Sequence, residues 1–173
     1  HASEQRNILA LSAYEKAVTQ EPKLGKDELM RTTVELMLDK KAPGVVEDAI
    51  GFLGVLVKET EDAAARERLV ALASSSEVLT TRQYAMRVVD ELGIGDGMDR
   101  LGSYLLDLEQ GETCADRKDA VAKLRAFGDK KAISPLIKAQ NRIRTQGLLK
   151  RKVNDNACLR TAADEAVRYL ESL

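Results

Sequence analysis

Apolar residues recur every three or four positions along almost the whole chain, the spacing that places side chains on one face of an α-helix. The pattern predicts nine helices, each of roughly 12–18 residues. The apolar stripes span residues 8–18, 29–37, 46–57, 69–73, 78–92, 98–108, 120–127, 133–140 and 159–170. No segment shows the alternation of apolar and polar residues that is typical of strands. The sequence therefore predicts an all-α fold.

Turn-forming residues lie between the stripes and support the predicted helix ends. Pro43 follows Lys40 and Lys41, and proline suits the first turn of the next helix. Gly93 and Gly128 each follow the last apolar residue of a stripe. At that position glycine can adopt the left-handed conformation that ends many helices.

The C-terminal two-thirds of the chain repeats itself. Residues 82–101 align with residues 117–136 at an offset of 35 positions, which superposes Ala85 on Ala120. A shift of 43 positions then superposes Ala120 on Ala163. A small residue at one fixed place predicts close contact between helices, and stacked helix pairs bury faces that no single pair can bury alone.

The segment RKDAVAKLRAFGDKKAISPLIKAQ resembles a HEAT-like repeat of the short bacterial kind, the PBS-lyase type, and NACLRTAADEAVRYLESL is similar to the first helix of another such unit. The resemblance implies a right-handed α-solenoid, a single continuous superhelix of about nine helices in stacked antiparallel pairs. The expected HEAT-like region spans residues 43–173, with repeats at 43–75, 78–109, 113–145 and 155–173.

The N-terminal segment departs from that pattern. In ALSAYEKAVTQEP, residues Ala10, Tyr14, Ala17 and Pro22 have the spacing of the second helix of a tetratricopeptide repeat. Residues 1–42 are therefore expected to form an N-terminal helical hairpin with a tetratricopeptide-like start. The His1-Ala2-Ser3 beginning and the missing initiator Met indicate a fragment of a larger protein.

Composition narrows the class of protein. The 173 residues are 44% hydrophobic and 32% charged, with a net charge of −1, which is typical of a globular chain and not of a disordered one. No apolar run is long enough for a membrane helix. Cys114 and Cys158 lie outside any CxxC pair. We expect them to be small apolar packing residues in a reducing, cytoplasmic compartment, with a disulfide or a reactive thiolate as alternatives.

Residues for catalysis are scarce. His1 is the only histidine, which argues against histidine-based triads, Cys–His dyads and histidine zinc sites. Glycines at 93, 95 and 97 follow a helix stripe instead of a strand, so they do not form a dinucleotide fingerprint. We therefore expect no enzyme activity, no cofactor and no metal site.

Charge is segregated along the chain. Between Asp129 and Asp155 there is no acidic residue, and this stretch carries a charge of +8 within a chain whose 27 basic residues are outnumbered by 28 acidic ones. Lys131, Lys138 and Arg142 are seven and four positions apart, which predicts one shared helix face. The longer repeat offset places an inserted loop at RTQGLLKRKV, and insertions in repeats often lie at a binding edge.

These features favour a non-enzymatic protein–protein interaction module or scaffold whose partner has an acidic surface. The predicted contact residues are Lys131, Lys138, Arg142, Arg144, Leu148, Leu149, Lys150, Arg151 and Lys152. Three alternatives stay open: a nucleic-acid-binding solenoid that uses the basic 130–152 stretch, a regulatory or accessory subunit of an enzyme, and a merely solvated basic surface. The stretch lacks the aromatic residues that stack on bases, which makes nucleic acid the weaker partner.

Overall fold

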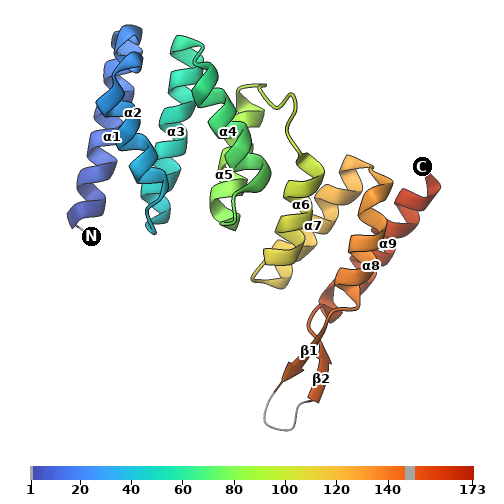
Figure 1. Cartoon of the computed structure of the whole chain (residues 1–173). Helices are drawn as coiled ribbons and strands as arrows, with labels where there is room; N and C mark the ends of the chain where they lie inside the picture. The colour runs from blue at the N-terminus through green and yellow to red at the C-terminus, as the bar shows by residue number, and fades with distance from the viewer. Residues whose placement is uncertain (1, 147–150) are drawn as a thin grey trace. The chain divides into compact units, whose positions relative to one another are not determined.

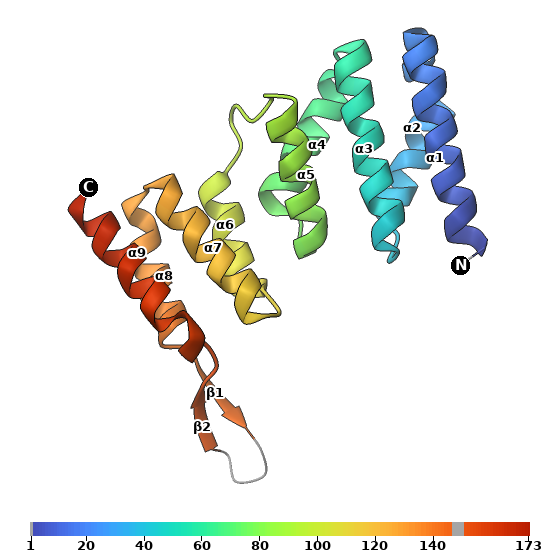
Figure 2. The same cartoon turned by 180° about the vertical axis from the view of Figure 1, so that it is seen from behind.

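The computed structural model describes residues 2–146 and 151–173 and is predominantly helical (Figures 1 and 2). Nine α-helices lie within these residues, and each coincides with or overlaps one of the nine predicted stripes. The chain divides into two compact units, one ending at Met98 and one spanning Asp99–Leu173. Within the described ranges no helix combines the length and the apolar character that crossing a membrane requires.

The first unit is built around one long apolar helix. Its elements are α1 (Ala2–Gln20), the short 3₁₀ helix η1 (Pro22–Lys26), α2 (Glu28–Leu38), α3 (Pro43–Thr60), α4 (Ala63–Ser75) and α5 (Leu79–Glu91). Helix α3 packs against α1, α2, α4 and α5. It buries side chains on most of its circumference, including Phe52, which is 0% exposed. Gly54 is buried where α3 meets α5, since a Cβ there would lie only 3.0 Å from Val88 Cγ1.

Aspartates fix where two of these helices begin. Asp27 accepts a hydrogen bond from the Met30 backbone N–H, and Asp62 accepts one from the Ala65 N–H. An N-cap carboxylate satisfies a donor that the first turn leaves unpaired and interacts favourably with the helix dipole.

The predicted boundary at 42/43 does not coincide with a division between units. Helices α1, α2 and α3 belong to the same unit. The rings of Tyr14 on α1 and Phe52 on α3 lie 6.0 Å apart, so the N-terminal helices share the core of the helices that follow.

The second unit contains two further pairs of helices. Its elements are α6 (Arg100–Gln110), α7 (Cys114–Phe127), η2 (Lys130–Ala132), α8 (Ile133–Gln140), β1 (Ile143–Gln146), β2 (Arg151–Asn154), η3 (Ala157–Leu159) and α9 (Arg160–Ser172). Helix α6 packs against α7, α8 against α9, and α7 against α9. The division at 98/99 falls inside the predicted repeat 78–109, whose two helices thus lie in different units.

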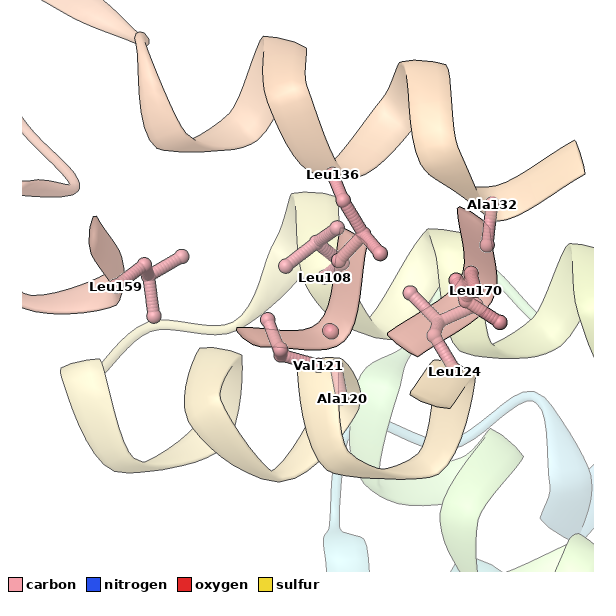
Figure 3. Packing of buried hydrophobic residues seen from close by; sticks show 9 residues of the cluster. Leu108, Ala120, Val121, Leu124, Ala132, Leu136, Leu159 and Leu170 are labelled. Atoms are coloured by element: carbon pink, nitrogen blue, oxygen red, sulfur yellow. The ribbon is translucent and has the colours of Figure 1, made fainter. Parts of the chain in front are cut away.

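Leucines and alanines from all four helices of this unit converge in one core (Figure 3). Its buried members are Leu108, Ala120, Val121, Leu124, Ala132, Leu136, Leu159, Ala166 and Leu170. Helix α7 enters this core behind a capping box, in which Thr113 and Asp116 satisfy each other's backbone N–H groups. The reciprocal pair fixes the first turn and hence the direction of the helix.

The predicted helix ends and alanine positions are confirmed in part. Gly93 and Gly128 have φ values of 65° and 77°, as expected for left-handed C-terminal residues. Ala85, Ala120 and Ala163 are all at most 1% exposed. The alignment fails at the end of the last helix: Phe127 is 45% exposed whereas its predicted counterpart Leu170 is 0% exposed. Helix α9 therefore uses a different apolar stripe from α7.

Two expectations from the sequence are wrong. First, the inserted segment contains strands: β1 and β2 form an antiparallel hairpin in which Ile143 pairs with Asn154 and Gln146 with Arg151. Short strands with charged residues between β-branched ones give too weak an alternation to predict. Second, Cys114 and Cys158 form a disulfide bond. The expectation of a reducing, cytoplasmic compartment rested on unpaired cysteines, and the bond removes that ground.

Candidate partner-binding groove

A groove of about 540 Å³ lies in the second unit, between α6 and α8 at the base of the hairpin. Its lining residues are Leu105, Leu108, Glu109, Ser134, Pro135, Lys138, Ala139, Asn141, Arg142 and Asn156. The set combines leucine, proline and alanine side chains with two cations and several amides or hydroxyls. Apolar surface with a few polar groups is the usual composition of a binding site.

The cations of the groove come from the end of α8. Lys138 lies in the last turn of the helix, and Arg142 follows the C-terminal residue Asn141. Both side chains belong to exposed residues. Arg142 Nη1 donates a hydrogen bond of 3.3 Å to the backbone carbonyl of Glu109 on α6, so its guanidinium crosses from one wall to the other. Four further guanidinium N–H donors of such a side chain can serve a ligand.

Three asparagines cap the end of α8, and two of them, Asn154 and Asn156, thereby hold the base of the hairpin against the helix. Asn141, Asn154 and Asn156 donate from Nδ2 to the carbonyls of Ile137, Gln140 and Ala139 respectively, at 2.8–2.9 Å. These carbonyls belong to the last turn, where a helix has few or no N–H donors of its own left to serve them. The Asp155 N–H also donates to the Arg142 carbonyl at 3.0 Å. The end of β2 and the residues that follow it are therefore fixed to the C-terminal end of α8.

Asn156 is the most buried polar residue of the groove, with an exposed fraction of 1%. Its Nδ2 reaches the Ala139 carbonyl, but its Oδ1 finds no donor among the described residues. A buried acceptor without a partner costs about 1–3 kcal/mol. A ligand that donates a hydrogen bond to this oxygen would remove that cost, which favours binding of a ligand with a donor at this position.

The structure brings only part of the predicted contact set together. Lys138 and Arg142 line the groove, whereas Lys131 lies in η2 and does not. The predicted common face fails because α8 begins at Ile133 and ends at Gln140, which leaves Lys131 and Arg142 outside it.

The remaining predicted contact residues belong to the hairpin segment. Arg144 lies in β1, and Arg151 and Lys152 lie in β2, where Arg144 pairs with Val153 and Lys152 with Thr145. Leu148, Leu149 and Lys150 lie outside the described residues.

Sequence reasoning missed the other half of the groove. Leu105, Leu108 and Glu109 come from α6, more than twenty positions before the basic stretch, and no local pattern joins the two. The asparagines at 141, 154 and 156 did carry a signal, because they flank both ends of the inserted segment. Asparagine amides are suited to capping backbone groups at element ends.

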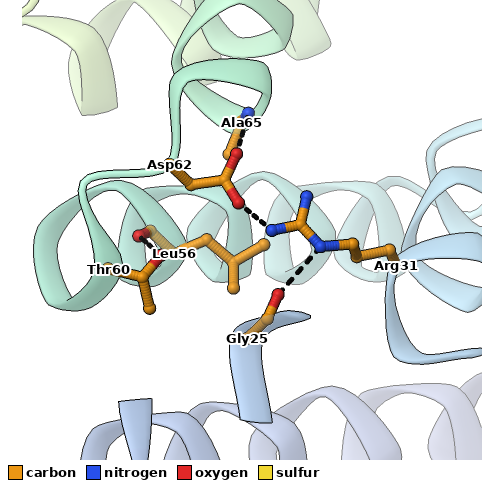
Figure 4. Close-up of polar contacts among 6 residues, drawn as sticks. All are labelled: Gly25, Arg31, Leu56, Thr60, Asp62 and Ala65. Carbon is orange, nitrogen blue, oxygen red and sulfur yellow. Dashed lines mark hydrogen bonds and ion pairs between the residues drawn. The ribbon is translucent and has the colours of Figure 1, made fainter. Parts of the chain in front are cut away.

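The first unit has a polar cluster whose role is structural (Figure 4). Arg31 donates from Nε to the Gly25 carbonyl at 2.8 Å and from Nη2 to the Asp62 carboxylate, which also caps α4. Arg31 also borders a shallow cavity of about 340 Å³. Because the donors and acceptors of this cluster serve one another, it joins η1, α2 and α4 instead of awaiting a ligand.

A second group of titratable residues lies between α1, α3 and α5. Burial raises the pKa of the Glu15 carboxyl, and the charge of Asp48 raises it further. Burial likewise raises the pKa of Asp48 and of the Tyr84 hydroxyl, although Arg87 opposes the rise at Tyr84. The Arg87 guanidinium stacks 4.5 Å from the centre of the Tyr84 ring. None of these residues borders the groove.

In the part of the chain that the structure describes, we find no group of side chains arranged for catalysis. There, no three His, Cys, Asp or Glu side chains lie close enough to hold a metal ion. The groove contributes one carboxylate, Glu109, and no nucleophile paired with a base.

Comparison of the chain with protein-family models, with curated proteins and with solved structures finds no match.

Proposed function

We propose that the chain is a non-enzymatic protein-interaction module whose groove between α6 and α8 binds a short acidic segment of a partner protein. The observation that carries the proposal is the joint lining of the groove by leucines and by Lys138 and Arg142. Apolar anchors in such a groove supply affinity, and the cations select a carboxylate and speed encounter.

The charge around the groove supports the same partner. No acidic residue occurs between Asp129 and Asp155, so the hairpin that continues from the groove carries only positive or neutral side chains. Within the groove Glu109 opposes two cations. A ligand that places a carboxylate near Lys138 and a backbone donor near Asn156 would complement both groups.

We further infer that the helices form HEAT-like repeats in a right-handed solenoid of antiparallel pairs. A recurring contact supports this: Arg31, Arg82 and Arg117 each donate to the backbone carbonyl six residues earlier, at Gly25, Ser76 and Gly111. Each arginine is the fourth residue of its helix. The occurrence at Arg31 favours one repeat family throughout over a tetratricopeptide-like start. Solenoids of this kind mostly bind other macromolecules along extended surfaces.

A phage-displayed library of random dodecapeptides tests the binding function. Selected peptides should combine Asp or Glu with a neighbouring Leu, Ile or Phe, and a synthetic copy should bind in solution. Lys138→Glu with Arg142→Glu should weaken that binding by about tenfold or more, the equivalent of a lost charged contact. The charge-matched control Lys16→Glu with Lys23→Glu, both exposed in the first unit, should leave it unchanged.

Nucleic acid is the competing ligand, and the apolar wall of the groove distinguishes it. Leu105→Ala, which removes an apolar side chain of the groove, should weaken peptide binding and spare binding to duplex DNA, whose affinity would instead fall linearly with log salt. Tight, steeply salt-dependent duplex binding, together with no peptide enriched on the groove, would overturn the proposal.

A further inference from the structure

The disulfide bond joins two elements that hold opposite ends of the hairpin-bearing segment. Cys114 is the first residue of α7, and Cys158 lies in η3, directly before α9. Helix α8 and the hairpin lie between them in the chain. The bond thus closes a covalent loop with a sequence separation of 44 residues, and this loop contains seven of the ten groove residues.

The two cysteines differ in access to solvent. Cys158 is exposed, whereas Cys114 is half-buried beside the core of the second unit. An external thiolate must approach along the S–S axis, and of the two residues Cys158 is the one that is open to solvent. The sulfur that leaves is then Cys114 Sγ, at the N-terminus of a 14-residue helix whose backbone dipole stabilises a thiolate.

We propose that the Cys114–Cys158 bond is a thiol-exchange site that is entered at Cys158. A thiolate of a thiol reductant attacks Cys158 Sγ, the S–S bond breaks, and the electron pair leaves on Cys114 Sγ. A second reductant thiolate then attacks the reductant sulfur of the mixed disulfide and releases Cys158 as a thiolate. Two thiols are oxidised to one disulfide, and the protein disulfide is reduced to two thiols.

Reduction acts on the anchoring of the hairpin more than on the core. Segment η3 contacts α7, α8 and α9. Two residues before Cys158, Asn156 caps the Ala139 carbonyl, and one residue after it Leu159 is fully buried. After reduction Leu159 still holds η3 in the core, whereas the residues before Cys158, including Asn156, are no longer tied covalently to α7. The order of the groove wall at Asn156 and of the α8 terminus is thereby linked to the redox state of this bond.

Mass spectrometry of the native protein tests the direction of the exchange. The protein is incubated with reduced glutathione, quenched with acid, alkylated and mapped by peptide. The expected mixed disulfide carries glutathione on Cys158 with Cys114 alkylated. Glutathione found chiefly on Cys114, or reduction that occurs only once urea has unfolded the protein, would overturn the proposal.

Hydrogen exchange of the reduced and oxidised protein tests the consequence. On reduction, the amides of residues 139–142 and 154–158 should exchange faster, on the order of tenfold, while those of Ala120–Leu124 stay protected. The variant Cys114→Ser with Cys158→Ser should reproduce the reduced pattern. Since reduction of the wild-type chain needs no substitution, the comparison stands even where that variant folds poorly. Loss of helical circular dichroism on reduction, or identical exchange in both redox states, would contradict it.

Discussion

Single small residues in this protein determine how closely two helices can pack. Ala120 is 1% exposed and lies within the core of leucines shown in Figure 3, with Val121 and Leu124 on the same helix. Alanine at this position fits because a larger side chain would meet atoms already packed at crystal-like density.

Substitution Ala120→Leu should therefore lower the free energy of unfolding by about 1–3 kcal/mol through overpacking. The chain contains no Trp, so urea denaturation followed by circular dichroism is the suitable measurement. Ala122→Leu, at an exposed position of the same helix, controls for helix propensity and should change stability little. Equal stability of the two variants would mean that α7 presents a different face to the core.

Glycines provide a matched pair at the residue scale. Gly128 ends α7 with φ at 77°, whereas Gly44 lies in the first turn of α3 with open space where a Cβ would be. We expect Gly128→Ala to destabilise by about 1 kcal/mol, because alanine is strained in the left-handed region. Gly44→Ala should stabilise by about 0.4–1 kcal/mol, because it restricts the unfolded chain. Shifts of the same sign in thermal unfolding would contradict this assignment.

At the scale of elements, the eight-residue helix α8 depends on side chains beyond its own end. Asn156, which is 1% exposed, donates to the Ala139 carbonyl, and this carbonyl also accepts from the Arg142 N–H at 3.2 Å, whereas Asn141 caps the Ile137 carbonyl at the surface. Truncation of a buried side chain removes its hydrogen bond and leaves space that water does not readily fill, whereas water replaces a bond lost at the surface.

Asn156→Ala should consequently lower stability by about 1 kcal/mol, because removal of the unpartnered Oδ1 offsets part of the lost hydrogen bond, and it should accelerate amide exchange at the end of α8. Asn141→Ala, which removes a similar bond in solvent, should cost less than half as much. Urea titration with hydrogen exchange measures both effects. Should Asn141→Ala prove the more damaging variant, the buried asparagine would not be the anchor of the hairpin.

The elements also show what a sequence can and cannot predict here. The helices can be predicted because the apolar stripe at 120–127 has the spacing of one buried helix face. Gly128 indicates the helix end, because glycine readily adopts a positive φ. The hairpin escapes prediction because four-residue strands stabilise each other only after Ile143 and Asn154 meet. The disulfide could not be predicted either, because two cysteines 44 residues apart in sequence can be near or far apart in the fold. The groove needs α6 and α8 together, and the sequence indicates only its cationic side.

At the scale of the whole molecule, stability depends on pH through the acidic group of the first unit. The folded-state pKa of Glu15 is raised by burial and by Asp48. A carboxyl whose pKa is higher in the folded state than in the unfolded state stabilises the fold fully only below its unfolded-state pKa. This stabilisation is lost as the pH rises through the folded-state pKa.

Glu15→Gln should thus make the protein more stable than wild type at neutral pH and equal to it at about pH 3, where the unfolded carboxyl is protonated. Urea midpoints measured across that range by circular dichroism give the difference. Exposed Glu67→Gln serves as the control. A wild-type chain that gains stability relative to Glu15→Gln as pH rises would reverse the sign of the argument.

The bond between Cys114 and Cys158 has one more consequence, which concerns the topology of the covalent chain. Helices α7 and α8 and the whole hairpin lie inside a ring, and the residues before 114 and after 158 are its two tails. One proteolytic cut anywhere in the ring therefore leaves a single molecule of almost unchanged mass. Trypsin finds many Lys and Arg sites in this segment, and limited digestion that cuts the ring once should produce one band on a non-reducing gel and two on a reducing gel. The hairpin can thus be nicked without losing α9.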